Sequence, residues 1–308
     1  MSTHSVAVIV PTFCRIDGLK LAINSVFAQQ YTHPFEIIIS DNDPSASAKS
    51  VAAELNDQSP DHINVKYVHM PEPGVSNARN AAMAKTDARL IASLDDDQTA
   101  ARNWLSALLD HHDTYACAVT FCPISTVLPN PDIKNADYLS QFFSRSPKHK
   151  TGYIDVYYGC GSSLIDRSQM PNISPLFDTE MNNSGGEDDV LFRRVQQDGG
   201  TFGYTNATEA YEHVPLSRAS ISYTLRRTFS YGQGPITEAR MRTPPRWDLV
   251  ACWMLVGAFK ATCNGAVFVI KWAMNDKSRI NNLDLFVQAL GKVLWWKTIN
   301  FYGSSHVS

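Results

Sequence analysis

The stretch Arg89-Leu90-Ile91-Ala92-Ser93-Leu94-Asp95-Asp96-Asp97 joins an apolar run directly to three carboxylates. The apolar part, residues 89–94, predicts a buried strand with the aspartates at its end. Neighbouring carboxylates repel one another, so a folded protein accommodates such a cluster best around positive charge. Oxygen ligands of this kind suit Mg²⁺ and Mn²⁺. Because open α/β sheets bind ligands at the carboxyl ends of their strands, this position favours a ligand site over a solvated acidic loop.

Strand and helix signals alternate on both sides of this stretch. Short apolar runs predict strands at residues 6–10, 35–40, 64–68 and 89–94. Helical periodicity lies between them, at residues 17–29, 46–55 and 74–84. This alternation predicts βαβ units and a mostly parallel sheet.

The second half of the chain has a mixed pattern. It predicts strands at 116–121 and 201–204, a loop at 123–131, a glycine-broken strand pair at 155–165, and helices at 187–197 and 218–231. We expect two parts, a catalytic domain over residues 1–235 and a basic, Trp-rich helical extension over residues 236–308.

Composition restricts the class of protein. The 308 residues are 44% hydrophobic, which is enough for a full core. The six cysteines include no Cys-x-x-Cys pair, so we expect reduced core thiols in a cytosolic protein. The first residues lead almost at once into a strand, so we expect no signal peptide.

The net charge of −3 is unevenly distributed. Residues 1–212 carry a net charge of −11 and residues 213–308 a net charge of +8. A basic tail suggests an anionic surface or an anionic substrate, and the alternative is that it docks on the acidic body. We expect no nucleic-acid partner.

The segment at residues 248–274 is apolar but contains Lys260. Its longest uninterrupted apolar run, residues 249–259, is shorter than the roughly 18–20 residues of a spanning helix. Arg246, Lys260 and Lys271 fall in one stripe on a helical wheel, as in a helix lying in the plane of a membrane surface. The alternatives are a helix packed on the domain, a helix in a homodimer contact, and a true span.

Further acidic and basic groups mark a candidate site. Asp41 ends the second predicted strand, and its alternative role is to form a turn. Gly185-Gly186-Glu187-Asp188-Asp189 opens a helix, where acidic residues also suit the helix dipole. A metal at one carboxylate cluster and a general base at the other would make a transferase or hydrolase site.

Taken together, these motifs resemble those of the family 2 glycosyltransferases over roughly residues 5–235. The motifs, in family order, are Val8-Ile9-Val10-Pro11-Thr12-Phe13, Ser40-Asp41-Asn42, Gly74-Val75-Ser76-Asn77-Ala78-Arg79-Asn80, Leu94-Asp95-Asp96-Asp97 and Gly186-Glu187-Asp188. The stretch at 185–194, with Val214-Pro215-Leu216-Ser217-Arg218 and Arg226-Arg227, looks most like bacterial exopolysaccharide glucosyltransferases of the succinoglycan type.

The resemblance implies a GT-A fold, which is an α/β fold with a Rossmann-like mixed sheet flanked by helices. It also implies an inverting, metal-dependent transfer of one hexose, such as glucose, from a UDP-sugar. Asp188 would be the general base, beside Glu187, and Asp189 is a second candidate. Asp97 would be the main ligand of Mn²⁺ or Mg²⁺, with Asp95 and His213 as further candidates. The residues expected at the nucleotide-sugar are Pro11, Thr12, Arg15, Asp41, Arg79, Asp95, Asp96, Arg226 and Arg227.

The expected acceptor is a saccharide linked to polyprenyl diphosphate, met at the cytoplasmic face of the bacterial inner membrane. The family's processive Gln-x-x-Arg-Trp motif is absent, since Arg226-Arg227-Thr228-Phe229 is a poor match, and this favours addition of a single sugar. The rival classes are a nucleotidyltransferase and a catalytically inactive carbohydrate-binding scaffold. The first would show a Gly- and Lys/Arg-rich loop after the first strand, and the second would be expected to lose carboxylates that are intact here.

Overall fold

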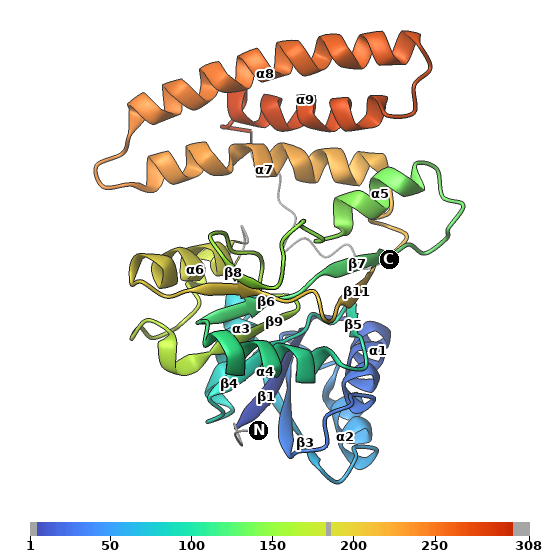
Figure 1. The fold of residues 1–308 in the computed structure, drawn as a ribbon, viewed down its shortest axis with the longest axis vertical. Coiled ribbons are helices and arrows are strands. Elements are labelled where there is room, and N and C mark those ends of the chain that lie inside the picture. Colours follow the sequence, from blue (N-terminus) through green and yellow to red (C-terminus); the bar gives the residue numbers. More distant parts are fainter. Residues whose placement is uncertain (1–4, 183–185, 298–308) are drawn as a thin grey trace. The chain divides into compact units, whose positions relative to one another are not determined.

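The computed structural model describes residues 5–182 and 186–297. They belong to two compact units (Figure 1). The sheet unit contains residues up to 127 and residues 144–213. The helical unit contains residues 128–143 and 214–297. The boundary expected after residue 235 falls inside a helix of the helical unit, and the structure instead divides after His213.

The N-terminal part of the sheet unit follows the predicted alternation. The strands are β1 (Val6–Thr12), β2 (Phe35–Asp41), β3 (Ile63–His69) and β4 (Leu90–Ser93). All three pairings among them are parallel, in the order β3-β2-β1-β4. Parallel pairing places the carboxyl ends of these strands at one edge, so the aspartates after β4 lie near the ends of β1 and β2.

The C-terminal part of the same sheet is mixed. The order continues from β4 with β9 (Ser163–Asp166), β6 (Val119–Phe121), β10 (Phe202–Tyr204) and β8 (Gly152–Ile154). Strand β9 is antiparallel to both β4 and β6, and β8 is antiparallel to β10. The mixed sheet of a GT-A fold is therefore confirmed, while a mostly parallel arrangement holds only for its first half.

A second, three-stranded sheet has the order β5-β11-β7. Its strands are β5 (Gln98–Ala100), β11 (Ala210–His213) and β7 (Ile124–Val127). Strand β7 occupies part of the segment predicted to be a loop, so that prediction was wrong there. Strand β11 leads to His213 and pairs with β5, which directly follows the three aspartates.

Helices cover both faces of the large sheet. They are α1 (Ile16–Phe27), α2 (Lys49–Asp57), α3 (Val75–Ala84), α4 (Trp104–Tyr115) and α6 (Glu187–Gln197), with 3₁₀ turns η1 (Arg167–Gln169) and η2 (Thr179–Met181). In β1, Val6, Val8 and Val10 join the core cluster that contains α1, α2 and α4. Ala7 and Ile9 join the cluster that contains α3 and α6. This strict alternation is the strand period of two.

The helical unit contains α5 (Ala136–Phe143), α7 (Ile221–Met241), α8 (Trp247–Ala273) and α9 (Arg279–Val293). Helix α9 packs against both α7 and α8. Helices α7 and α9 approach closely because glycines meet: a Cβ added to Gly291 would collide with the carbonyl of Phe229, and one added to Gly232 with the carbonyl of Gln288. A polar cluster links α5 and α7 to α9, since Asp284 accepts hydrogen bonds from Tyr138 (2.7 Å) and Thr228 (2.6 Å).

Helix α8 differs from the sequence-based expectation. Lys260 does not interrupt it, and the helix runs for 27 residues. By length and composition it could cross a membrane, since its most apolar 18-residue window has a mean hydropathy of 1.5 and is only 11% buried within the protein. The expectation that this segment is too short to span a membrane is therefore wrong as a statement about helix length.

Candidate functional site

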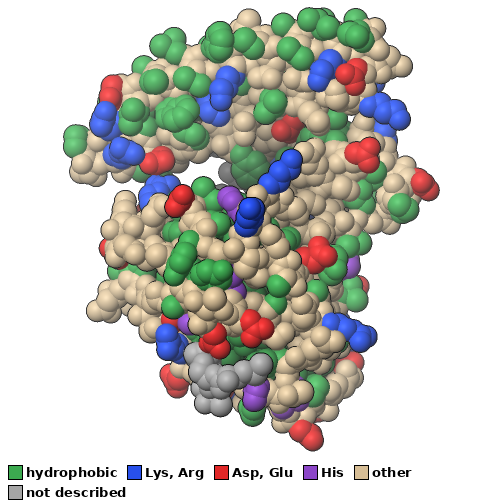
Figure 2. Space-filling view, in the orientation of Figure 1, with side chains coloured by type: hydrophobic (Ala, Val, Ile, Leu, Met, Phe, Trp, Pro, Cys, Tyr) green, Lys and Arg blue, Asp and Glu red, His purple; other side chains and the backbone are tan. Residues whose placement is uncertain are grey.

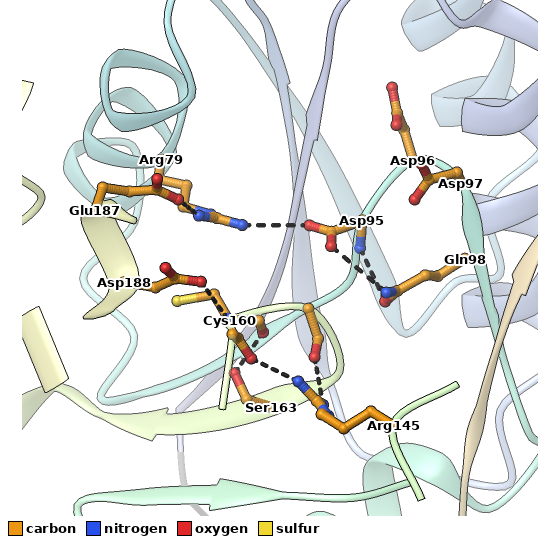
Figure 3. Close-up of polar contacts among 12 residues, drawn as sticks. Arg79, Asp95, Asp96, Asp97, Gln98, Arg145, Cys160, Ser163, Glu187 and Asp188 are labelled. Carbon is orange, nitrogen blue, oxygen red and sulfur yellow. Dashed lines mark hydrogen bonds and ion pairs between the residues drawn. The ribbon is translucent and has the colours of Figure 1, made fainter. Parts of the chain in front are cut away.

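Arg79 joins the two acidic motifs. Its guanidinium, on α3, forms an ion pair with Glu187 at the start of α6 and a second one, at 3.4 Å, with Asp95 (Figure 3). Arg79 and Glu187 are both about 95% buried, so the charges are largely removed from water and depend on each other. The structure thereby brings the predicted residues Arg79, Asp95 and Glu187 into one cluster, with Arg79 facing carboxylates inside the fold.

Asp188 lies at the N-terminus of α6 and is held by backbone amides. One carboxylate oxygen accepts a hydrogen bond from the N–H of Cys160 at 3.0 Å, and the other accepts from the N–H of Asp189 at 2.9 Å. Its side chain and that of Asp95 point towards a common space (Figure 3). These two hydrogen bonds fix the direction in which the carboxylate points.

The backbone of residues 159–162 completes this space. A Cβ on Gly161 would collide with the carboxylate of Asp95, and one on Gly159 would lie 3.0 Å from that of Asp188. Gln98 contacts Asp95 at 3.5 Å. Burial raises the pKa of Asp95, and the negative charges of Asp97 and Asp188 raise it further, against the opposing effect of Arg79.

Asp96 and Asp97 lie apart from this group and share a different cation. Arg15, which precedes α1, donates to Asp96 at 2.9 Å and to Asp97 at 2.7 Å. The hydroxyl of Thr12 donates to Asp96 at 2.9 Å. Burial and the charge of Asp97 raise the pKa of Asp96 to about 6, although Arg15 and Thr12 favour its anionic form.

His213 lies beside the aspartates, as its place at the end of β11 requires. The backbone N–H of His213 donates to the backbone carbonyl of Asp97 at 2.8 Å, and the ring atom Nε2 lies 2.9 Å from the hydroxyl of Thr99. Burial lowers the pKa of His213, and the charge of Asp97 opposes this effect. A neutral imidazole is the form that binds metals.

The described residues contain no group of three or more His, Cys, Asp or Glu side chains arranged to hold a metal by themselves. This donor set does not fit a structural, all-protein metal site. It does fit Mg²⁺ or Mn²⁺ bound through one or two carboxylates together with substrate phosphates. The expected ligands are carboxylate oxygens of Asp97 and Asp95 and a nitrogen of His213. Their roles as ligands stay predictions.

Asp41 is the last residue of β2 and is fully buried. It accepts hydrogen bonds from the amides of Asp43 (3.0 Å) and Ala48 (2.9 Å) and from the hydroxyl of Tyr67 (2.9 Å). These bonds fix the turn, as the alternative interpretation of Asp41 proposed. Pro11 pairs in register with Ser40 at the same edge. The nucleotide contacts of Pro11, Thr12 and Asp41 stay predictions.

The remaining predicted residues lie outside these contacts. Asp189 is exposed on α6, and its pKa is raised to about 6, first by partial removal from water and then by Asp188. Arg226 and Arg227 belong to α7 in the helical unit. Arg227 Nε donates to the hydroxyl of Tyr231 at 3.0 Å, and its guanidinium lies over that ring.

Two participants were not predicted from the sequence. The amide of Cys160 contacts Asp188, and Arg145 donates to carbonyls at residues 159, 161 and 162. The glycines in Gly159-Cys160-Gly161-Ser162-Ser163 were the available signal, because glycine permits close approach to another group. Nothing in the sequence near Arg145 indicates its contacts.

Comparisons with known proteins identify the family. The model for glycosyl transferase family 2 matches residues 7–170, which is more than half of the chain. The chain belongs to this family. It is therefore a glycosyltransferase, and the resemblance inferred from the motifs is confirmed.

Individual relatives agree with this assignment. The chain is 28% identical over 275 residues to the succinoglycan biosynthesis protein ExoM of Rhizobium meliloti, covering 88% of this chain and 87% of that protein. Among solved structures, it resembles a mannosyltransferase of Pyrobaculum calidifontis in complex with GDP-Man and Mn²⁺, with a TM-score of 0.62, 17% identity and coverage of 96% and 88%. It also resembles residues 1–349 of S. aureus TarS in complex with UDP, with a TM-score of 0.54, 13% identity and coverage of 95% and 91%. These structures support the GT-A fold.

Proposed function

We propose that this glycosyltransferase transfers one hexose from a UDP-sugar to a saccharide acceptor with inversion at the anomeric carbon, using Asp188 as the general base. The observation that carries the proposal is that the side chains of Asp188 and Asp95 point towards the same space. The two belong to separate acidic motifs, which Arg79 joins through its ion pairs with Glu187 and Asp95.

The residues divide the chemistry between them. Asp188 accepts the proton of the acceptor hydroxyl as that oxygen attacks the anomeric carbon from the face opposite the leaving diphosphate. Its two backbone hydrogen bonds hold the carboxylate in place and leave it lone pairs for this proton. Glu187 is engaged by Arg79, which leaves Asp188 as the better placed base of the pair.

Asp97, Asp95 and His213 would hold the divalent cation. When bound, Mn²⁺ or Mg²⁺ neutralises charge on the donor diphosphate. Thr12, Arg15 and Asp96, which contact one another, would bind the nucleotide-sugar. Asp41 and Arg79 would contact its nucleoside. The expected roles of Arg226 and Arg227 at the leaving diphosphate or at an anionic acceptor stay predictions. The GDP-Man and Mn²⁺ named for the Pyrobaculum structure, which has a similar fold, support a nucleotide-sugar and a divalent cation in general.

The acceptor is a growing saccharide carried on polyprenyl diphosphate, as in exopolysaccharide synthesis. Similarity to a succinoglycan biosynthesis protein over 88% of the chain supports this choice. The helical unit then associates with the cytoplasmic face of the bacterial inner membrane, with a homodimer contact as the alternative use of α8. Leu255, Phe259 and Trp272 on α8 are exposed, which supports an apolar surrounding for this helix. Figure 2 shows hydrophobic side chains on the surface of the helical unit.

The test is turnover of a panel of nucleotide-sugars. The purified protein is incubated with UDP-glucose, UDP-galactose, UDP-GlcNAc and GDP-mannose, each with Mn²⁺, with Mg²⁺ or with EDTA, and release of nucleoside diphosphate is measured. We expect one UDP-hexose to be hydrolysed or transferred only with metal, and NMR of a transfer product to show inversion. Turnover that persists in EDTA, or a retained anomeric configuration, would contradict the proposal.

A further inference from the structure

Arg145 lies behind the site, on the far side of the peptide group that contacts Asp188. Its backbone is fixed by two reciprocal hydrogen bonds to Ile124 at the start of β7, each 2.8 Å long. Its guanidinium lies over the rings of Phe121 and Tyr158, with its central carbon 5.7 and 5.6 Å from their centres. Both ends of the side chain are therefore held by the sheet unit itself.

The guanidinium donates only to backbone carbonyls in the contacts described. Nη1 donates to Gly159 at 2.7 Å, and Nη2 donates to Gly161 at 2.6 Å, to Ser162 at 3.0 Å and to Cys122 at 3.3 Å. Nε is buried without a hydrogen-bond partner. Burial lowers the pKa of Arg145, while the charges of Asp95 and Asp188 act in the opposite direction.

One planar peptide group connects this cation to the base. The carbonyl of Gly159 accepts from Arg145, and the N–H of the same peptide, on Cys160, donates to Asp188 at 3.0 Å. Because a peptide is planar, fixing the carbonyl also fixes the direction of the N–H. Hydrogen bonds in such a chain polarise one another, so the cation strengthens the amide as a donor to the carboxylate.

The same guanidinium fixes the approach to Asp95. It donates to the carbonyl of Gly161, whose Cα lies so close to Asp95 that a Cβ would collide with that carboxylate. Arg145 therefore holds one loop that contacts both acidic motifs (Figure 3). A structural Arg elsewhere in the unit, Arg167, makes a comparable 2.6 Å bond to the carbonyl of Thr86 and contacts neither motif.

We infer that Arg145 is a positioning residue for catalysis, which orients the base Asp188 through the Gly159–Cys160 peptide group and fixes Asp95 through Gly161. The inference rests on the proposed role of Asp188. Arg145 touches neither donor nor acceptor in this scheme. Its effect therefore belongs to the chemical step rather than to donor binding.

The experiment compares Arg145→Met, Arg145→Lys and the matched control Arg167→Met. With the nucleotide-sugar that the unchanged protein turns over fastest, Arg145→Met should lower kcat by about 10²-fold, the cost typical of a misplaced catalytic group, while KM for the donor changes less than about threefold. Arg145→Lys keeps the positive charge on a single donor nitrogen, and its kcat should be about tenfold higher than that of Arg145→Met. Arg167→Met should retain kcat.

Amide hydrogen exchange supplies a readout that needs no substrate. Peptides covering residues 157–164 should exchange faster in Arg145→Met than in the unchanged protein or in Arg167→Met. Unchanged exchange there, or a kcat within about threefold of the unchanged protein, overturns the inference. A protein that turns over no nucleotide-sugar at all contradicts the proposed function instead, and exchange still decides whether Arg145 holds the loop.

Discussion

In the sheet unit, charged side chains lie buried around Asp95, whereas in the helical unit large apolar side chains of α8 lie exposed. Arg79 and Glu187 are about 95% buried, while Leu255 and Phe259 are 73% and 72% exposed. Each arrangement costs free energy by itself, because buried charge loses hydration and exposed apolar surface orders water. The buried charges compensate one another through the ion pair of Arg79 with Glu187, whereas the described residues leave most of the apolar surface of α8 uncovered.

The largest effect that tests this contrast is expected at Asp188. Asp188→Asn keeps an oxygen that can accept from the amide of Cys160 but cannot take a proton from the acceptor. We expect transfer to fall by about 10²–10⁴-fold, the usual contribution of a general base, with donor affinity nearly unchanged. Asp189→Asn is the matched control, since Asp189 is the neighbouring carboxylate on the same helix turn. A loss confined to Asp189→Asn would move the role to that residue.

The second effect concerns Asp97. Asp97→Ala removes a proposed metal ligand that also forms an ion pair with Arg15. The residue lies in the turn after β4 and not in the hydrophobic core. We expect metal-dependent binding of the donor to be abolished while the melting temperature changes little. Calorimetric titration with UDP-glucose, with and without Mn²⁺, measures this. Equal donor binding in the variant and the unchanged protein would exclude Asp97 as a ligand.

The regular half of the sheet unit was predictable because its signals are local. Strands β1, β2 and β4 are largely buried runs of four to seven residues, β3 is partly exposed, and helices of ordinary length separate the four. Helix α4 was missed because the polar residues His111 and His112 lie on its buried face and interrupt the apolar periodicity of the sequence. Strands β5 and β11 were missed because they have only three and four residues, too few to show a period of two in the sequence.

The carboxylates of the candidate site were predictable for a different reason. Asp95, Asp97 and Asp188 occur in motifs whose order along the chain resembles a known family. Arg145 had no such signal, because its partners are backbone carbonyls, which every residue carries. Arg79 was predicted as a nucleotide contact, but its ion pairs with Glu187 and Asp95 depend on residues 108 and 16 positions away, so only the fold could reveal them.

The third effect concerns the exposed face of α8. A double variant, Leu255→Ser with Phe259→Ser, removes two side chains whose burial in lipid would each contribute about 1.5–3 kcal/mol. We expect affinity for vesicles containing phosphatidylglycerol to fall by about tenfold or more, measured by flotation. Binding of the unchanged protein should also weaken with salt, since residues 213–308 carry a net charge of +8.

The control for this test lies in the other unit. Leu21→Ser with Val127→Ser removes two exposed apolar side chains of the sheet unit, 54% and 38% exposed, and should leave flotation unchanged. If the unchanged protein does not float and the α8 variant only dissociates an oligomer, the apolar face is a contact between copies of the chain. That outcome would contradict membrane association.

The smallest effect tests whether buried charge in the sheet unit also serves stability away from the site. Asp166 is fully buried at the end of β9, forms an ion pair with Arg89 (2.7 Å) and lies within hydrogen-bond distance of His112 Nε2 (3.1 Å). Burial by itself raises the pKa of Asp166, but hydrogen bonds from Arg89, Gln169 and Ser168 outweigh it and hold the pKa below its usual range. The folded state therefore favours the anion more than the unfolded state does.

The sign of the pH dependence follows from this direction. A lowered pKa stabilises the fold at all pH values above the unfolded pKa of about 3.9, and this contribution is lost as the pH falls below that value towards the folded pKa. Asp166→Asn should cost about 1–3 kcal/mol near neutral pH, the range for leaving buried partners unsatisfied. Calorimetric unfolding at pH 7 and pH 3 should show a smaller difference between variant and unchanged protein at pH 3. Asp198→Asn, at an exposed position after α6, is the control, and an equal loss in both variants would mean that Asp166 contributes no more than a surface carboxylate.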